Sequence, residues 1–324
     1  MGWDIVGDAI DAIEKWFKGV LADGIVGCLE NTVSTLNSTF NTKNQGIMKT
    51  LLQDRPDQFT GSTDENAETI WSGIETLTNN AIVPIGVFIL VIVLMYKLIQ
   101  MVISGNNFRD FDTSIFIRWT IKSVCGILLV SNVFYITTNI FAFGSASVTD
   151  GLNTIFPDSG GSFLDSAELG SHLKSNLTKL DVGPLLVILI LAFLIAIVTF
   201  IVLGAIIIVL ASRMIEIFMY LSISPIPMAT FMNRDWGDMG KNWLRNILAL
   251  AFQGFFIVVA LTIFKVLLGN VLTQMSNMGA SALAANKVAA SVTGSMAIML
   301  GYILALIFTI FRSSNISKSA FAAH

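Results

Sequence analysis

Length, composition and charge exclude a soluble globular protein. The chain has 324 residues, of which 54% are hydrophobic and only 13% are charged, and its mean hydropathy is +0.74. Soluble domains carry about 25% charged residues, so this chain lacks the polar residues to cover a globule of its size. The net charge of −3 gives no general attraction to nucleic acid or anionic lipid, and two cysteines are too few for a disulfide framework. We therefore predict an all-α, polytopic integral membrane protein.

The first 80 residues begin with an amphipathic pattern. Apolar residues recur at three- and four-residue steps between Ile5 and Leu21, with aspartates and lysines on the opposite face. Gly24 interrupts this stripe, and a similar one continues from Ile25 to Phe40. The pattern predicts a helix that lies on the outer leaflet or packs on a partner subunit; a small helical hairpin that packs on itself fits equally well.

Five stretches are long and apolar enough to cross a bilayer. A helix needs ~20 apolar residues to span ~30 Å of hydrocarbon, and the stretches that meet this length are residues 81–103, 121–143, 183–211, 247–268 and 292–311. The third stretch contains no charged residue. Residues 214–232 are also apolar, but they carry Glu216 and are broken by Pro225 and Pro227. This stretch spans, re-enters or lies at the interface, and charge favours the view that it does not span.

Lysines and arginines set the orientation, because positive residues in short loops stay cytoplasmic. With five spans, ten basic residues fall on one side, Arg213 among them, and four fall near the membrane on the other. We predict a multi-pass protein of the cell (plasma) membrane with its N-terminus outside and its C-terminus in the cytoplasm. The predicted regions are an extracytoplasmic amphipathic helical region (1–80), transmembrane helices 1 and 2 with a basic cytoplasmic loop (81–143), an extracytoplasmic loop (144–182), and transmembrane helices 3 to 5 with a cytoplasmic turn at 213–245 (183–324).

No motif in the chain carries recognisable chemistry. Residues 237–242 fail as a phosphate loop, because no hydroxyl follows Lys241 and no strand precedes the glycines. We expect no enzymatic activity, no cofactor and no metal site. Arg213 and Glu216 are three residues apart and should meet on one helix face, either as a neutralised pair at the cytoplasmic boundary or as a relay or gate.

Two rows of residues fall at helical spacing inside predicted spans. The polar stripe of the second span either lines a wet path or bonds neighbouring helices; it consists of Ser131, Asn132, Tyr135, Thr138 and Asn139. The small residues of the fifth span favour close helix packing or an oligomer interface; they are Gly294, Ala297, Gly301 and Ala305.

The turn at 213–245 combines prolines, tryptophans and basic residues. Pro225 and Pro227 forbid a continuing helix. Trp236 and Trp243 suit the headgroup level of a membrane. Three cations follow in the same turn, and the predicted topology puts them just inside the cytoplasmic leaflet; they are Arg234, Lys241 and Arg245.

Residues 220–265 resemble the TrbL family of polytopic membrane proteins in type IV secretion and conjugation systems. The similar features are a Ser-Pro-x-Pro turn after a long apolar helix, a short polar stretch and a tryptophan-led entry into the next span; here they are Ser224, Pro225, Pro227, Trp236, Trp243 and Arg245. The N-terminal helix, which begins Gly2-Trp3-Asp4, looks like the shorter members from Gram-positive bacteria.

The resemblance implies a subunit of a conjugative type IV secretion machine. Such a subunit would oligomerise in the bilayer and form part of the translocation channel for single-stranded DNA with its attached relaxase, which it would contact transiently. The implied partners are other secretion membrane subunits and the cytoplasmic secretion ATPases that supply energy. With the resemblance included, the turn at 213–245 is predicted to dock such an ATPase; an ordinary anchored loop is the alternative.

Two other functions remain open from the sequence. A secondary transporter or small-solute permease would carry inverted repeats and intramembrane charges, whereas this chain has no visible repeat and no charge in its clearest span. A structural membrane scaffold without a conduit is the other alternative.

Overall fold

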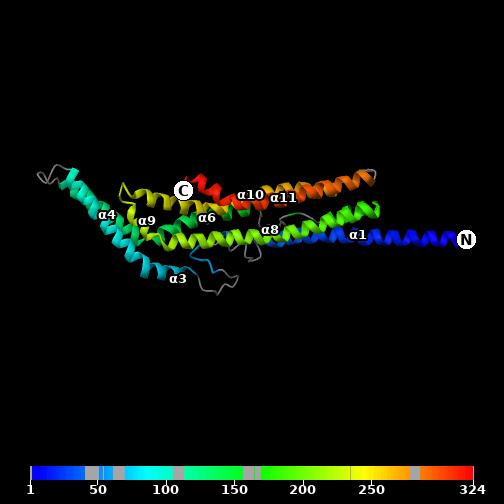
Figure 1. Ribbon diagram of the computed structural model, residues 1–324, viewed down its shortest axis with the longest axis horizontal. Coiled ribbons are helices and arrows are strands. Elements are labelled where there is room, and N and C mark those ends of the chain that lie inside the picture. The colour runs from blue at the N-terminus through cyan, green and yellow to red at the C-terminus, as the bar shows by residue number, and fades with distance from the viewer. Residues whose placement is uncertain are drawn as a thin grey trace. The chain divides into compact units, whose positions relative to one another are not determined.

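The described part of the chain is helical, and no strand occurs in it. The computed structural model describes residues 2–40, 51–53, 55–60, 70–104, 113–155, 164, 169–233, 235–277 and 285–323. Figure 1 shows the helices, which are α1 (Gly2–Phe40), α3 (Ile70–Leu77), the π-helical turn η1 (Thr78–Ile82), α4 (Val83–Ser104), α5 (Thr113–Ser131), α6 (Val133–Ile155), α7 (Leu169–Leu177), α8 (Val182–Ser222), α9 (Pro225–Thr230), α10 (Gly237–Asn277) and α11 (Ala285–Ala320).

Several of these helices are membrane-spanning by length and composition. Among the described residues, four helices pass this test: Ile70–Ile103, Val182–Ser222, Gly237–Ser276 and Lys287–Ala320. The bent pair α5 and α6 makes a fifth if it is taken as one span. The all-α, polytopic prediction is confirmed, and four of the five predicted spans lie within single helices.

The second predicted span is not one straight helix. The segments Phe116–Ser131 and Val133–Thr154 meet at an angle of 66°. The break falls at Asn132, whose side-chain amide donates 2.9 Å to the carbonyl of Leu128. Residues 121–143 are therefore either a broken span or a re-entrant segment.

The chain divides into two compact units, and α8, α10 and α11 each contribute residues to both of them. Unit 1 consists of Met1–Gly46, Leu152–Ile208 and Val258–Phe311. Unit 2 consists of Ile47–Gly151, Val209–Ile257 and Arg312–His324.

In unit 1, α1 is a single helix of 39 residues that continues through Gly24. Its second half buries Leu21, Ile25 and Leu29 among other apolar side chains, and this burial offsets the ~1 kcal/mol that a glycine costs inside a helix. Within the unit, α1 packs against α7. The interpretation of this region as a small helical hairpin that packs on itself is therefore wrong.

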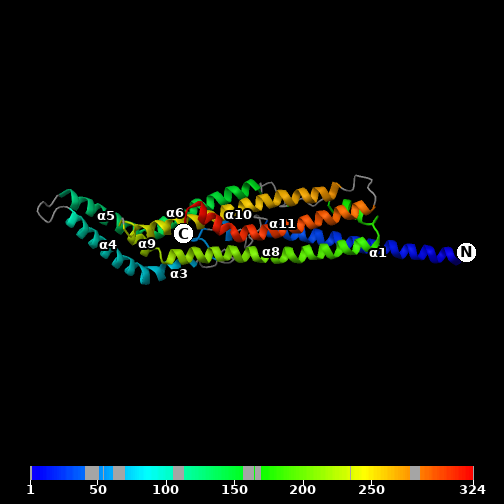
Figure 2. The same cartoon turned by 45° about the horizontal axis from the view of Figure 1, so that its top comes forward.

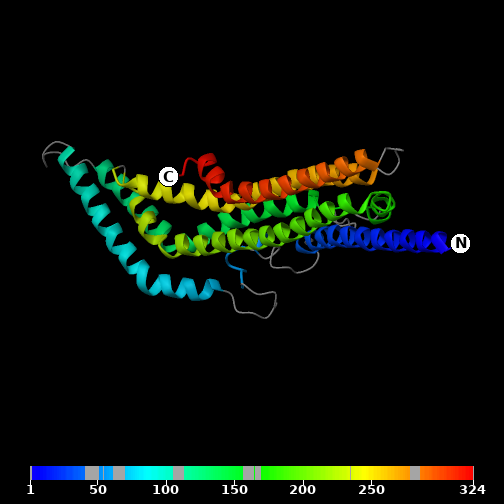
Figure 3. The same cartoon turned by 45° about the vertical axis from the view of Figure 1, so that its right-hand side comes forward.

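The same helix runs parallel to the beginning of α8 (Figures 1 and 3). Lys18 lies 3.6 Å from Asp181, directly before α8. Six residues further along α1, a methyl group placed on Gly24 would lie 3.4 Å from Leu189 of α8. Residues 21–40 of α1 thus lie beside the first part of α8, the most apolar helix of the chain.

In unit 2, α4 and α5 form a hairpin, and the short helix α9 packs on both (Figure 2). The indole nitrogen of Trp119 donates 3.0 Å to the carbonyl of Leu94 and ties α5 to α4. α3 continues through η1 into α4, so that the helix begins well before the predicted span at residue 81. α4 and α5 thus contact the proline-containing turn that the sequence analysis identified.

Candidate functional site

The turn after α8 folds as a short, buried helix. α8 ends at Ser222 and α9 begins with Pro225 at its first position, where proline is tolerated because its missing N–H has no helical partner. Two glycines allow the prolines to approach closely. A methyl group on Gly86 of α4 would lie 2.8 Å from Pro225 Cβ, and one on Gly240 of α10 would lie 2.6 Å from the Pro227 carbonyl oxygen. The prolines end α8, and they also hold α9 in close contact with α4 and α10.

Polar groups at the two ends of α9 are buried. Ser224 and Asn233 are at most 2% exposed, and among the described residues Ser224 Oγ and Asn233 Nδ2 have no hydrogen-bond partner. Thr230, by contrast, donates 2.8 Å to the Pro227 carbonyl. An unsatisfied buried polar group costs about 1–3 kcal/mol, so water or a partner that reaches this turn would stabilise it.

The two tryptophans of the predicted docking surface differ in their surroundings. Trp243 is buried, and its indole nitrogen donates 3.1 Å to the Tyr220 carbonyl near the end of α8. Trp236 is 46% exposed and stacks on Tyr96 of α4, with ring centroids 5.9 Å apart and an interplanar angle of 10°. Trp243 is therefore a core residue that joins α10 to α8, and its assignment to a docking surface is wrong.

The basic residues of the same turn are accessible. Lys241 and Arg245 are exposed on the first turns of α10, and Lys241 pairs with Asp238 at 3.0 Å on the same helix. Exposed pairs of this kind contribute ~1 kcal/mol or less, so Lys241 can exchange Asp238 for a partner at little cost. Arg234 lies outside the described residues.

The polar stripe of the second span is divided by the bend at Asn132. Ser131 ends α5, whereas Tyr135, Thr138 and Asn139 lie on α6. Thr138 and Asn139 donate to carbonyls one turn back in their own helix, at 2.9 and 2.8 Å. These bonds do not join neighbouring helices. Tyr135 and Asn139, with Phe143 and two residues of α10, instead line a shallow groove of about 490 Å³.

The charged residues of α8 in unit 2 bond to residues that are far from them in the sequence. Arg213 is 6% exposed and donates to the carbonyls of Leu250 and Leu51, at 3.1 and 3.3 Å. Glu216 instead accepts from Lys318 of α11 at 2.9 Å. The predicted pairing of Arg213 with Glu216 is therefore wrong, because each side chain has a closer partner outside the helix that they share.

Arg213 also changes the topology argument. The predicted topology separates residues 51–59 and Arg213 by the bilayer, but Arg213 bonds to the Leu51 carbonyl, and the rings of Phe59 and Phe218 lie 6.1 Å apart. Residues 51–59 and the α8 segment 211–218 therefore lie at one level. Arg213 is buried and bonded to backbone carbonyls, so it does not mark a cytoplasmic loop. It therefore does not define the membrane boundary.

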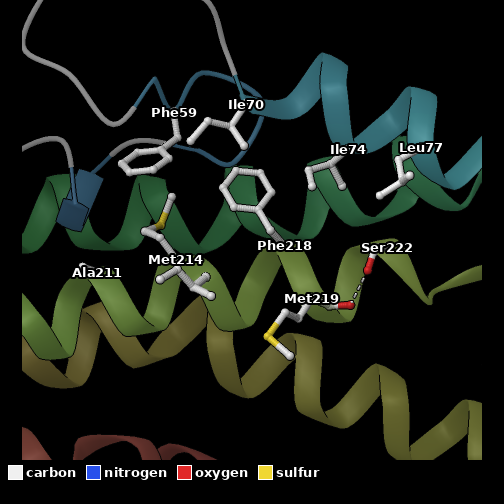
Figure 4. A pocket seen from close by; sticks show the side chains of 10 residues that line it. Phe59, Ile70, Ile74, Leu77, Ala211, Met214, Phe218, Met219 and Ser222 are labelled. Atoms are coloured by element: carbon white, nitrogen blue, oxygen red, sulfur yellow. Dashed lines mark hydrogen bonds between the residues drawn. The ribbon is translucent and has the colours of Figure 1, made fainter.

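A cavity of about 460 Å³ lies beside this contact in unit 2. Figure 4 shows Phe59, Ile70 and Ile74 on one wall, facing Met214 and Phe218 of α8. The lining is apolar except for Ser222, whose hydroxyl donates 2.8 Å to the Met219 carbonyl. Among the described residues, the lining therefore offers no charged group for recognition of a charged solute.

In unit 1, the second half of α1 has one apolar and one polar face. The apolar face is buried, whereas Asn31, Ser34, Thr35 and Ser38 are exposed on the opposite face. Beside this open strip, Asp23 pairs with Lys174 of α7 at 2.5 Å. The amide of Asn37 exchanges two hydrogen bonds with the backbone of residue 164, at 2.7 and 3.0 Å. The sequence pattern showed the apolar stripe, but the place of the polar strip beside α8 becomes visible only in the structure.

The row of small residues on α11 lies on an exposed face. Gly294, Ala297, Gly301 and Ala305 are all exposed, and a methyl group on either glycine would meet nothing within 4 Å. Among the described residues, this row therefore does not serve packing within the chain. Its use as an interface between chains stays a prediction.

Taken with the apolar helices, this arrangement defines a polytopic α-helical membrane protein with a buried proline-containing turn. The sequence profile of the family described as TrbL/VirB6 plasmid conjugal transfer like protein matches residues 54–225, more than half of the chain, and the chain belongs to this family. Neither a curated protein nor a solved structure matches the chain.

The family match confirms the predicted family from a different part of the chain. The resemblance rested on residues 220–265, whereas the matched region ends at residue 225 and covers α3 to α8 with the first residue of α9. Membership makes the chain a membrane component of a conjugal transfer system, which works with other components of that system.

Proposed function

We propose that this chain is a membrane subunit of a conjugative type IV secretion system and contributes to the translocation channel for single-stranded DNA with its attached relaxase. Its place would be the plasma membrane, with the N-terminus outside and the C-terminus in the cytoplasm. It would act without enzymatic activity of its own and take energy from partner ATPases. The family and the number of apolar helices support this role.

The polar strip on α1 is the observation that carries the proposal. Residues 183–211 of α8 contain no charge, so this part of α8 belongs at bilayer depth. The second half of α1 lies beside the beginning of that segment and exposes Asn31 and Ser34 on its outer face. Polar side chains at this depth face water or protein rather than lipid, which favours a wall of a water-filled passage.

Cysteine accessibility tests this role in donor cells. With the native Cys28 and Cys125 replaced by serine, Ser34→Cys should react with a charged thiol reagent, and the bulky adduct should lower DNA transfer at least tenfold. Ile197→Cys, on an exposed apolar position of α8, is the matched control and should stay unmodified.

Two results would contradict the proposal. If Ser34→Cys and Leu36→Cys, on the buried face, both resist the reagent, the polar strip is covered by protein. Full modification of Ser34→Cys with unchanged transfer would mean that water reaches the strip but that the transferred DNA does not pass it, as in a scaffold.

We also propose that the turn after α9 docks a cytoplasmic ATPase through a smaller surface than the sequence indicated. The exposed residues Trp236, Lys241 and Arg245 support this proposal, whereas Trp243 takes no part because it is buried. Charge contacts at such a surface weaken as salt rises. Co-purification of the ATPase should therefore decrease with salt.

A further inference from the structure

The first half of α1 carries an apolar stripe that its own unit does not cover. Residues 8–17 are exposed on every side of the helix. Ile10, Ile13 and Val20 are 58%, 65% and 47% exposed. Exposed apolar surfaces of this kind mark interaction sites, so the stripe calls for something that covers it.

The stripe also points away from the face that packs in unit 1. At 3.6 residues per turn, the stripe Ile10–Ile13–Phe17–Val20 and the buried face around Ile25 and Leu29 are about 120° apart around the helix axis. Charged residues occupy the side of the first half that continues the buried face. Lys18, for example, bonds Glu14 at 2.8 Å and lies 3.6 Å from Asp181. Unit 1 therefore contacts this half of the helix at Lys18, on its charged side, and leaves the stripe exposed.

Lipid cannot cover the whole stripe. α1 runs parallel to α8, and Lys18 lies at the level where α8 begins. The preceding residues continue beyond that level, and Ile10 stands about 12 Å further along the helix axis. An interfacial helix lies in the membrane plane, whereas α1 runs parallel to the spanning helix α8 and therefore projects out of that plane. Moreover, Asp8, Asp11 and Glu14 outnumber Lys15 and Lys18 here, which gives no attraction to anionic headgroups.

The spacing of the stripe fits a helical seam between identical chains. Ile10, Ile13, Phe17 and Val20 follow the three-four spacing of coiled-coil core positions, and in the sequence Trp3 and Val6 extend it to about three heptads. The charged residues of this segment lie away from the seam. Glu14 is the exception, but it flanks the seam while bonded to Lys18 of its own helix. Two copies therefore bring no unpaired like charges together.

We propose that copies of this chain associate through the first half of α1, with Ile10, Ile13, Phe17 and Val20 of one copy packed on the same residues of the next. The contact keeps the N-terminal segments parallel and close together beyond the level at which α8 begins. This inference concerns the assembly of the subunit and does not depend on what the assembly transports.

Disulfide cross-linking in native membranes tests the contact on the full-length chain. With Cys28 and Cys125 replaced by serine, single cysteines at Ile13 and Phe17 should form cross-linked dimers on mild oxidation. Cysteines at Asp11 and Lys15, equally exposed on the other side of the helix, are the matched controls and should give at least tenfold less dimer.

Equal yields from all four positions would overturn the proposal, because they would report random collision. Cross-links from Ile13→Cys to a different protein would also overturn it, since another subunit would then cover the stripe. Ile13→Asp provides a second readout without oxidation: the oligomer in mild detergent should dissociate while membrane insertion persists, and an unchanged oligomer would count against the seam.

Discussion

Replacing Gly86 by alanine should destabilise unit 2 by forcing α4 away from α9. The added methyl group would lie 2.8 Å from Pro225 Cβ and 3.1 Å from the Pro225 carbonyl carbon and oxygen, whereas carbon atoms pack at about 3.5–4.0 Å. The two helices must therefore separate by roughly 0.5–1 Å. Overpacking of this kind costs about 1–3 kcal/mol, and the better helix propensity of alanine returns about 0.5–1 kcal/mol. We expect a net loss of about 1 kcal/mol, within a range of about 0–2.5 kcal/mol.

Gly73→Ala on α3 of the same unit is the matched control. A methyl group there would meet nothing within 4 Å, so this variant should keep the full gain in helix propensity. Both proteins would be purified in mild detergent and titrated with a denaturing detergent while helicity is followed by circular dichroism. Gly86→Ala that proves as stable as Gly73→Ala would refute the close seating of α9.

Three further predictions concern unit 2. Trp243→Phe removes the indole donor to the end of α8 and should cost about 1 kcal/mol in the same titration; an unchanged midpoint would show that the bond contributes nothing. Glu216→Gln and Lys318→Met should couple by about 0.5–1 kcal/mol in a double-mutant cycle, because both side chains are about one third exposed; purely additive effects would contradict the pair. Lys241→Glu combined with Arg245→Glu should lower DNA transfer at least tenfold at normal protein level, whereas wild-type transfer with unchanged topology would reduce the turn to an anchor.

The sequence predicts the apolar helices well because their signal is local. Residues 183–211 are strongly apolar and contain no charged residue, and they lie within α8 as expected. The bend at Asn132 is harder to foresee, since neither proline nor glycine stands beside this residue in the sequence. Hydropathy averages over that residue and predicts a continuous span.

The errors at the site share one cause, which is that partners far along the chain decide what a polar residue does. Glu216 pairs with Lys318, 102 residues away, so spacing on α8 could not identify its partner. Trp243 matches a headgroup residue by type, but the Tyr220 carbonyl satisfies its indole inside the core. Arg213 counts as a loop cation in the sequence and is buried against two carbonyls in the structure.

A photo-crosslinking residue placed on α1 tests the central claim, that the transferred strand passes the polar strip. Benzoylphenylalanine would replace Asn31 on the open strip, with Ile197 on the exposed apolar face of α8 as the control position. Both proteins would be irradiated in donor cells during mating and recovered under denaturing conditions. We expect the transferred DNA strand to be recovered with the Asn31 variant and not with the Ile197 variant. Ongoing transfer without any DNA recovered from Asn31, or equal recovery from both positions, would contradict it.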